Sequence, residues 1–372
     1  MDTFGGRYAK SLVRAARAAM RDVLAVRKGE RVLVITNPQE DVAQISMALY
    51  DAAVEMSASP VLMVQGKKGQ FDFAEQEVIK AMTADPQVVL SISEDRLGKD
   101  RYGLAKGYRG RKRRYDHYFD LLYEERGMRG FWSPGATVDI FSRTVPIDYR
   151  QMRSDAARFC RKTSSGVSVR VTAPGGTDMT VGIVGRRFRS DNGDFRRSGR
   201  AGNLPSGEVF VSPALGTAEG TIVFDGSIVV NDHDVVIKRP IAVAVSKGRI
   251  TSITGGREAA LLKASVVEGE TRARKMGRSG QIDSRLAEQY ARNAWSIGEL
   301  GIGLNRKARI VANMLEDEKV YGTCHFAVGS NYDGDAEAMI HLDGLVKRPT
   351  IAIVTKRGRE EQVMVDGRLV WD

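Results

Sequence analysis

Two of the four histidines in this chain, His325 and His341, lie close together near its C-terminal end. Asp343 follows His341 by two positions in the sequence MIHLDGL. Alternate residues of a β-strand face the same side, so this spacing brings both side chains within reach of one ion. Neutral imidazole and carboxylate are common ligands of divalent metals. The three residues predict a metal site, with a structural hydrogen-bonded pair as the alternative interpretation of His341 and Asp343.

Two glutamates earlier in the chain lie beside glycine-rich sequence. Glu208 follows the turn sequence Pro-Ser-Gly, and we expect Glu299 where a helix ends in a glycine-rich loop. Together with the two histidines and the aspartate they make five nitrogen and oxygen ligands. Several carboxylates in one site favour a pair of divalent ions, because carboxylates can bridge two ions and offset their charge. These ligand types accept zinc, cobalt, manganese or iron.

The elements that must position these residues differ between the two halves of the chain. Near the N-terminus, the apolar runs ERVLVIT, SPVLMVQ and PQVVLSIS alternate with the helical patterns QEDVAQISMALYDAAVEM and FAEQEVIKAMTA. Strand, helix and strand in turn favour a parallel α/β sheet. The loops after these strands lack the glycine-rich phosphate-binding motifs, so we interpret this half as a scaffold.

From about residue 166 the sequence changes to short β-rich runs with frequent glycine, interrupted by a helical insert at about 257–298. The fold class is therefore predicted as α/β: a Rossmann-like α/β domain at 1–163, then a β-rich α+β metal-binding domain at 164–372. A helix over 146–163 is expected to join them.

Composition limits the kind of protein and its location. The longest apolar runs are far shorter than the roughly 20 residues of a membrane helix. The N-terminus lacks an export signal, and only two cysteines, Cys160 and Cys324, are present. We therefore expect a cytoplasmic protein.

The net charge of +11 lies partly in the basic segment 106–118, which predicts a solvated, mobile loop. Nucleic-acid binding is not expected, because no recognition motif accompanies the charge, and attraction of an anionic substrate or partner is the alternative.

Four segments in order, NLPSGEVFVSP, IGELGIGLN, LEDEKVYGTCHFAVGSNY and IHLDG, resemble the signature segments of the M29 metallopeptidases, the family of aminopeptidases T and S. The resemblance covers about residues 200 to 345. It places the family's ligands for two divalent ions on the five residues named above, and its catalytic tyrosine on Tyr332. The resemblance also implies a homodimer.

The activity expected from this resemblance is hydrolysis of a peptide or small amide substrate by metal-activated water. Tyr332 would donate a hydrogen bond to the developing oxyanion, and Glu299 could shuttle a proton. The same family resembles a ring-cleaving enzyme, 2,5-dihydroxypyridine dioxygenase. The alternative is therefore a single Fe(II) held by His325, His341 and Asp343 that acts on a dihydroxy-aromatic substrate. A binding protein with a structural metal is a third possibility.

The sequence LEDEK at 315–319 leaves further alternatives open. Its carboxylates, Glu316, Asp317 and Glu318, could support the metal ligands, act as a general base or face solvent in a turn. Lys319 could orient a substrate carboxylate or lie on the surface. Cys324 precedes His325, so on a strand it points to the opposite face, where we expect a packed core thiol.

Overall fold

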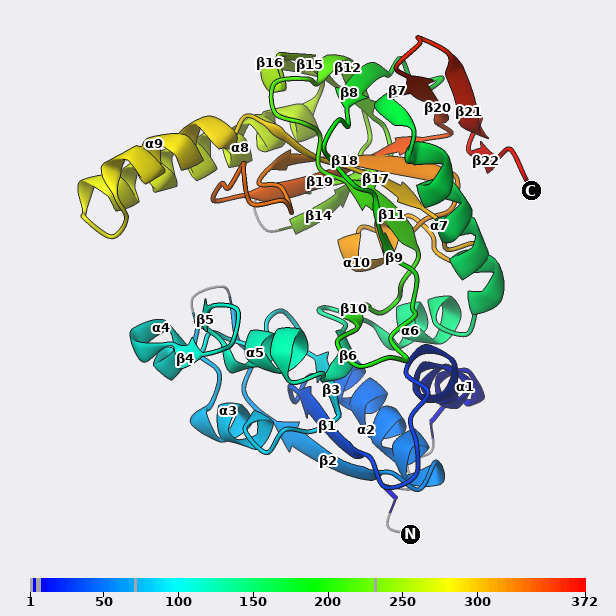
Figure 1. Ribbon diagram of the computed structural model, residues 1–372, viewed down its shortest axis with the longest axis vertical. Coiled ribbons are helices and arrows are strands. Elements are labelled where there is room, and N and C mark those ends of the chain that lie inside the picture. The colour runs from blue at the N-terminus through cyan, green and yellow to red at the C-terminus, as the bar shows by residue number, and fades with distance from the viewer. Residues whose placement is uncertain (1–2, 5–7, 70–71, 231–232) are drawn as a thin grey trace. The chain divides into compact units, whose positions relative to one another are not determined.

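The computed structural model describes residues 3–4, 8–69, 72–230 and 233–372. The chain forms two compact units, which are described separately (Figure 1). Unit 1 comprises Met1–Arg153 and Asp191–Ser206, and unit 2 comprises Ser154–Ser190 and Gly207–Asp372. The predicted domain ranges, 1–163 and 164–372, stay a proposal.

Unit 1 contains a five-stranded sheet in the order β10-β6-β3-β1-β2, with all neighbouring strands parallel. The strands are β1 (Arg31–Thr36), β2 (Ser59–Val64), β3 (Val88–Ile92), β6 (Arg129–Trp132) and β10 (Ala201–Asn203). The helices are α1 (Lys10–Ala18), the π-helix η1 (Ala19–Val23), α2 (Glu40–Glu55), α3 (Gln76–Met82), α4 (Arg101–Lys106), α5 (Tyr118–Glu125) and α6 (Val138–Thr144). The predicted strand and helix alternation of this half is confirmed.

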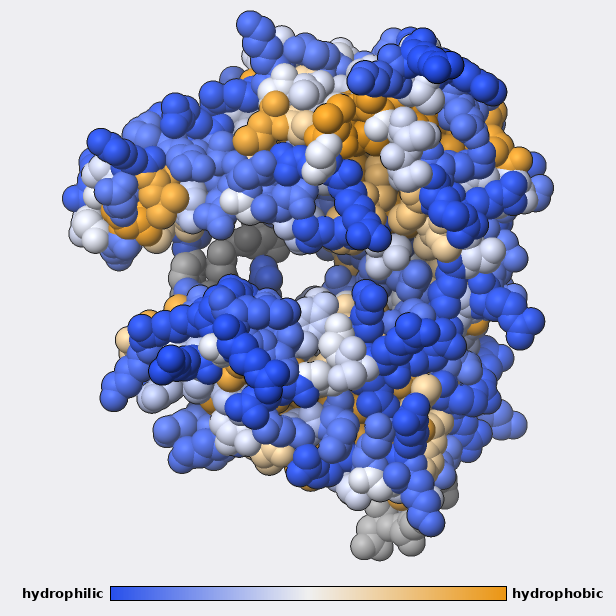
Figure 2. Space-filling model, in the orientation of Figure 1, coloured by the Kyte–Doolittle hydropathy of each residue, from blue (hydrophilic) through white to orange (hydrophobic). Residues whose placement is uncertain are grey.

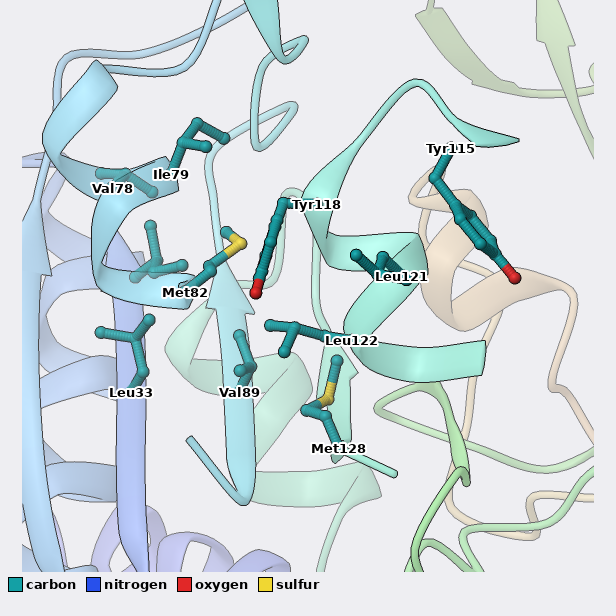
Figure 3. Packing of buried hydrophobic residues seen from close by; sticks show 11 residues of the cluster. Leu33, Val78, Ile79, Met82, Val89, Tyr115, Tyr118, Leu121, Leu122 and Met128 are labelled. Carbon is teal, nitrogen blue, oxygen red and sulfur yellow. The ribbon is translucent and has the colours of Figure 1, made fainter. Parts of the chain in front are cut away.

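The inner strands β1 and β3 of this sheet are buried because helices pack on it, whereas the edge strand β2 is partly exposed. Strand β3 is buried at every residue, as expected of a strand covered on both faces. Helices α1, α2 and α6 pack against one another, whereas α3 packs against α5. Figure 3 shows this second group: Met82 of α3 and Tyr118 and Leu122 of α5 converge near Val89 of β3. Burial of such apolar side chains is the main driving force for folding of this unit.

The basic segment 106–118 forms a small hairpin of β4 (Tyr108–Arg109) and β5 (Arg114–Tyr115). The backbone N–H groups of Arg111 and Lys112 donate to the Glu125 carboxylate, and Arg113 pairs with Glu124. Figure 2 shows mainly hydrophilic residues over this part of the molecule. The segment is solvated as predicted, but two carboxylates of α5 hold it in a defined hairpin.

Unit 2 contains two largely antiparallel sheets. The seven-stranded sheet has the order β14-β13-β19-β18-β17-β11-β9 and the eight-stranded sheet the order β16-β15-β12-β8-β7-β20-β21-β22. The first sheet consists of β9 (Arg189–Asp191), β11 (Glu208–Val211), β13 (Ser227–Val230), β14 (His233–Val236), β17 (Ile297–Gly303), β18 (Thr323–Gly329) and β19 (His341–Lys347). The second consists of β7 (Gly166–Thr172), β8 (Asp178–Gly182), β12 (Glu219–Phe224), β15 (Ile241–Ser246), β16 (Arg249–Thr254), β20 (Thr350–Thr355), β21 (Glu360–Val365) and β22 (Arg368–Leu369).

The two sheets of unit 2 contact each other where β12 meets β19. The Phe224 ring lies so close to Gly344 that an added Cβ would be 2.7 Å from it. Four helices complete the chain: α7 (Tyr149–Thr163), α8 (Arg257–Arg278), α9 (Ser284–Asn293) and α10 (Met314–Asp317). Helices α8 and α9 lie side by side (Figure 1) and form the predicted insert. Within the described residues, no helix has the length and apolar character needed to cross a membrane.

Candidate metal centre

Four strands of the seven-stranded sheet supply the predicted ligands. Strands β11, β17, β18 and β19 are consecutive neighbours in this sheet (Figure 1). His341 and Asp343 lie on β19 two residues apart, the arrangement that their spacing predicts. His325 lies on β18, where it pairs with Gly301 of β17 and Leu345 of β19. The sheet thereby brings residues far apart in sequence onto one surface.

Both glutamates also lie on strands. Glu208 is the first residue of β11, directly after the predicted turn, and Glu299 lies within β17. The expectation that Glu299 lies where a helix ends in a loop is wrong, because helix α9 ends at Asn293 and the chain has already joined the sheet at Ile297. Glu299 is only 3% exposed. A strand position fixes its carboxylate more rigidly than a loop would.

The glycine opposite His325 explains part of the glycine-rich sequence around Glu299. A Cβ atom on Gly301 would lie 2.0 Å from Nε2 of His325, which is far inside van der Waals contact. The imidazole therefore occupies the space that any other side chain would fill. Gly301 is required for this packing and not for a special backbone angle.

The five predicted ligands lie close together in the structure. Glu208, Glu299 and His325 offer ligand atoms within 4.8 Å of one another, as do Glu299, His341 and Asp343. A third such group consists of Glu318, His325 and Asp343. Glu299 and Asp343 each belong to a group with either histidine, so these two carboxylates connect the imidazoles.

Distances within the cluster fit ligands around an ion better than direct hydrogen bonds. His341 Nε2 lies 3.3 Å from Glu299 Oε2 and 3.4 Å from Asp343 Oδ1. His325 Nε2 lies 3.5 Å from Glu299 Oε1. Charge-assisted hydrogen bonds are shorter, at about 2.7–2.9 Å. Ligands about 2.1 Å from a common ion are expected roughly 3.0–3.4 Å apart.

Unsatisfied polar atoms in the cluster support the same interpretation. Among the described residues, the buried atoms that make no hydrogen bond include Nε2 of both His325 and His341, Oε2 of Glu208 and Oδ1 of Asp343. Leaving such atoms unpaired in a protein interior is costly, so native structures rarely do so without a ligand. The carboxylate and histidine groups form a candidate divalent metal site, and the residues present fit a metal ion.

A backbone contact sets the orientation of the more exposed histidine. Nδ1 of His341 lies 2.9 Å from the carbonyl oxygen of Ser330. A ring N–H that donates to a carbonyl leaves the other nitrogen, Nε2, as the acceptor that can bind a metal. His341 is thus held in the tautomer that a ligand needs.

A buried lysine completes the cluster. Lys319 is 0% exposed, and its ammonium donates to Glu208 Oε1 at 2.6 Å and Glu318 Oε1 at 2.5 Å. The possibility that Lys319 lies on the surface is wrong. Lys319 and Glu318 follow α10, which contacts β13 of the same sheet.

Protonation of the cluster is set by burial and by its mixed charges. Burial opposes the charged form of His325, but the nearby carboxylate of Glu299, with the charges of Asp343 and Glu208, raises its pKa to about 9. Burial would also raise the pKa of Asp343, but the neighbouring His341 lowers it to about 2. Burial raises the pKa of Glu318 to about 8, against the opposing effect of Lys319. Without a bound metal, the imidazole of His325 therefore carries a proton at neutral pH, whereas Asp343 is ionised.

Tyr332 lies at the edge of the cluster. Its ring centroid is 5.2 Å from that of His341 and 5.2 Å from that of Phe210 on β11. The residue is 52% exposed, so Tyr332 lies at the border between the cluster and solvent. Loss of water around the hydroxyl, together with the charge of Glu299, raises the pKa of Tyr332 above its usual value.

Ion pairs hold the loop that carries Tyr332. Arg186 pairs with Asp335 at 2.6 Å and with Asp333 at 3.3 Å, and Arg189 pairs with Asp333 at 2.6 Å. Asn331 donates to Asp335 at 2.6 Å and accepts the N–H of Gly334. These contacts fix the loop beside the histidines.

The remaining polar residues of LEDEK have structural roles. Glu316 and Asp317 are 0% exposed, so the interpretation as a solvent-facing turn is wrong for them. Asp317 accepts the hydroxyl of Ser227 and the backbone N–H of Val311. Cys324 is buried on the opposite face of β18 from His325, as expected.

Two members of the cluster were not assigned by sequence reasoning. Glu318 belongs to a ligand group and Lys319 contacts two carboxylates, yet neither was among the predicted site residues. The available signal was four consecutive charged residues between Leu315 and the apolar Val320. Which of them face the site depends on α10, whose direction the sequence does not reveal.

Comparison with known proteins identifies the family. A family model described as 2,5-dihydroxypyridine 5,6-dioxygenase (NicX) matches residues 134–370, which is more than half of the chain. The chain belongs to this family. The 2,5-dihydroxypyridine 5,6-dioxygenase of Pseudomonas putida is 25% identical over 216 residues, and the match spans 55% of this chain and 55% of that protein.

Solved structures show the same fold over nearly the whole chain. The 2,5-dihydroxypyridine dioxygenase from Pseudomonas putida KT2440 has a TM-score of 0.71 at 18% identity, covering 98% of this chain and 99% of that one. AmpT from Thermus thermophilus has a TM-score of 0.65 at 16% identity, covering 97% and 99%. At these identities, the likeness shows the fold alone. It agrees with the predicted relation to the aminopeptidase T fold.

The prediction of an aminopeptidase-like hydrolase is wrong. The family match and the curated relative both carry the name of a dioxygenase, which is the alternative that the sequence left open. The fold is common to structures of both activities, so the four signature segments do not separate the two. The roles predicted for Tyr332 and Glu299 in amide hydrolysis are withdrawn with that activity.

Proposed function

We propose that this protein is a ring-cleaving dioxygenase that uses one divalent iron ion and acts on a dihydroxylated aromatic compound such as 2,5-dihydroxypyridine. The observation that carries this proposal is the family match over residues 134–370, which includes the whole buried cluster from Glu208 to Asp343. The relative from Pseudomonas putida bears the name of this activity.

The residues that would hold the iron are His325, His341 and Asp343. Two histidines and one carboxylate form the ligand set typical of non-heme Fe(II) oxygenases. Asp343 lies in a group with each histidine, and the Ser330 carbonyl orients His341. When bound, ferrous iron supplies the electron exchange that lets dioxygen react with an electron-rich ring.

Glu299 supports this set from between the imidazoles, at 3.5 Å from His325 and 3.3 Å from His341. Its carboxylate and that of Asp343 together carry two negative charges, which match one divalent ion. Burial of both carboxylates makes this balance important, because unpaired charge in a protein interior is unfavourable. Glu299 is therefore a fourth ligand or the group that orients both histidines.

Glu318 is positioned to handle the substrate proton. Burial raises the pKa of its carboxyl to about 8 in the metal-free cluster, and a divalent ion bound nearby would favour the carboxylate form that can accept a proton. It shares a group with His325 and Asp343, so a hydroxyl bound at the ligands lies within its reach. We assign Glu318 as the base that removes a hydroxyl proton from the aromatic diol.

Tyr332 and Phe210 form an aromatic border beside His341. Aromatic side chains hold planar rings through stacked or edge-on contacts. This border fits an aromatic substrate and gives Tyr332 a role in orienting it.

The proposal is tested by oxygen consumption. Protein purified without oxygen and loaded with Fe(II) is expected to consume oxygen when 2,5-dihydroxypyridine is added, with one molecule of oxygen incorporated per product by mass spectrometry. A Glu318→Gln variant should retain iron. Its rate of oxygen consumption, however, should no longer increase as the pH is raised above neutrality. A folded, iron-loaded protein that consumes no oxygen with dihydroxypyridines or dihydroxybenzenes would refute the proposal. We also propose that the protein forms a homodimer, which a light-scattering measurement of the molar mass would test.

A further inference from the structure

Unit 1 contains a cavity of about 430 Å³ that the proposed reaction does not use. Its wall includes Ser91 of β3, Ser93 just after that strand and Trp132, the last residue of β6. The loop at 95–99 and the start of α5 complete it. Ligands of open parallel sheets bind beyond the carboxyl ends of the strands, which is where this cavity lies. Its volume is that of a typical small-molecule site.

Two aromatic side chains form one corner of the cavity. The ring centroids of Phe119 on α5 and Trp132 on β6 lie 6.0 Å apart, with the ring planes at 76°. Both residues are only partly buried. A flat ring that stacks on one of them would meet the edge of the other, and these are the two contact geometries that aromatic pairs favour. The corner therefore fits a planar ring.

Hydrogen bonds hold this corner in place. Nδ1 of His117 accepts the backbone N–H of Phe119 at 3.1 Å, and Nε2 lies 3.1 Å from the carbonyl oxygen of Gly98. Because Nδ1 is an acceptor, Nε2 carries the proton and donates to that carbonyl. Both ring nitrogens are thus in use, and His117 fixes the wall of the cavity. A site that is formed in advance loses less entropy when a ligand binds.

Asp120 supplies a hydrogen-bond acceptor beside the aromatic corner. Tyr118, Leu121 and Leu122 form the core side of α5 (Figure 3), whereas Asp120 lies outside this set and lines the cavity. Within the described ranges, its carboxylate has no hydrogen-bond or ion-pair partner. Burial raises the pKa of Asp120 above its usual value. A carboxylate in this position gains from a ligand that donates a hydrogen bond to it.

The other polar groups of the wall indicate what else the ligand should carry. The hydroxyls of Ser91 and Ser93 can donate to an acceptor on the ring. Asp95 and Arg96 pair with each other at 3.4 Å, and Lys99 is the remaining basic group of the lining. Two acidic and two basic side chains give no net charge, which favours an uncharged ligand with donors and acceptors over a phosphate.

We propose that unit 1 binds a planar nitrogen heterocycle in this cavity. The ring lies in the corner of Phe119 and Trp132, and an amino or ring N–H group donates to Asp120. The missing phosphate-binding motif, on which the interpretation as a scaffold was based, does not exclude such a ligand, because a flat ring and a carboxylate make the contacts. The inference goes beyond the proposed function, since no residue of the metal cluster lines the cavity.

The test compares two probes on metal-free protein by calorimetric titration at pH 8, where both are mainly uncharged. 2-Aminopyridine and 2-methylpyridine have similar size, but only the first carries a donor beside the ring nitrogen. We expect 2-aminopyridine to bind wild-type protein about tenfold more tightly, because a hydrogen bond to a charged acceptor contributes that much. The preference should disappear in Asp120→Ala. It should remain in Asp116→Ala, which removes an exposed carboxylate outside the cavity.

Further variants locate the bound ring. Phe119→Leu removes one aromatic wall and should weaken the binding of both probes alike. Equal affinities of the wild type for the two probes overturn the proposal, as does a preference that persists in folded Asp120→Ala. The absence of saturable binding at millimolar concentration overturns it as well.

The metal cluster is the competing location for the probe. Binding of 2-aminopyridine that is lost in His341→Ala but kept in Asp120→Ala would place the ring at the cluster and overturn the proposal. Because the titration uses neither metal nor oxygen, its outcome does not depend on whether the protein is a dioxygenase.

Discussion

Each unit contains charged side chains that are buried beside a sheet. The two units differ in how completely the polar atoms of these side chains are hydrogen-bonded. In unit 1, Arg129 donates to both oxygens of Glu30 and to the carbonyls of Leu24 and Ala25. In unit 2, several buried atoms of the cluster make no hydrogen bond, among them Nε2 of both histidines, Oε2 of Glu208 and Oδ1 of Asp343. Complete pairing marks a structural ion pair, and incomplete pairing marks a place for a ligand.

The difference also appears in what surrounds the charges. Arg129 and Glu30 form one pair, and the Glu30 pKa is lowered because hydrogen bonds from Arg129 outweigh its burial. The cluster of unit 2 contains four carboxylates but one ammonium, from Lys319. An excess of buried negative charge is stable only with a further cation or bound protons.

Removal of a proposed ligand should have the largest effect. His341→Ala is expected to lower metal affinity at least about 100-fold, more than the loss of an outer hydrogen-bond partner usually costs, and to reduce oxygen consumption to background. Metal content by elemental analysis and oxygen electrode traces measure both effects. His233→Ala, at an exposed position of the same unit, is the matched control and should change neither.

Breaking the paired ions of unit 1 should change stability alone. Arg129→Met leaves the Glu30 carboxylate without its partner and is expected to cost about 3–5 kcal/mol of unfolding free energy. Urea denaturation measures this loss. The exposed Arg17 pair with Glu55 provides the control, and Arg17→Met should leave the denaturation midpoint unchanged. If folded Arg129→Met protein lost its bound metal, the pair formed by Arg129 and Glu30 would have a role beyond stability, which would contradict this comparison of the two units.

Crowding the His325 ring should affect stability and metal binding together. Gly301→Ala adds a Cβ that would lie 2.0 Å from Nε2 of His325, so the ring must move. Overpacking of this kind typically costs about 1–3 kcal/mol. Thermal unfolding and cobalt titration measure the two effects. Gly66→Ala, where nothing lies within 4 Å of the added atom, should be neutral, and a Gly301→Ala protein with normal cobalt affinity would argue against His325 as a ligand.

Metal affinity should rise with pH. Before a metal binds, the pKa of His325 is about 9, so at neutral pH the ring carries a proton that the ion must displace. Below that pKa, each displaced proton makes the apparent affinity increase about tenfold per pH unit as pH rises. Competition with a chelator between pH 6 and 8 measures this slope. An affinity that does not vary with pH would show that no protonated histidine is displaced.

Loosening the Tyr332 loop should have the smallest effect. Arg186→Gln removes the ion pairs to Asp333 and Asp335, and because both aspartates remain partly exposed to water, the loss of stability should be small. We expect a rise in KM of about threefold, with kcat nearly unchanged, because substrate orientation depends on the loop while the ligands remain in place. Steady-state oxygen consumption measures both constants. A large fall in kcat would instead place the loop among the groups that act in the reaction step.

Much of the local structure follows from sequence pattern. The apolar runs at β1, β2 and β3 and the helical pattern of α2 were predictable, because burial on a sheet or a helix face imposes its own period. The pair formed by His341 and Asp343 was predictable for the same reason, since alternate strand residues face one side. The segment over 191–206 shows the limit, because only the fold assigns it to unit 1 through β10.

The ligand types, the strand spacing of His341 and Asp343 and the membership of a fold shared by two enzyme classes were all readable from the chain. The register that places Gly301 under His325, the strand position of Glu299 and the inward direction of Lys319 were decided by tertiary structure. The physical reason is that periodicity arises from neighbouring residues, whereas burial and charge pairing arise between segments that meet only in the folded sheet. LEDEK demonstrates this: two of its carboxylates hold a loop, and the next carboxylate and lysine face the metal cluster.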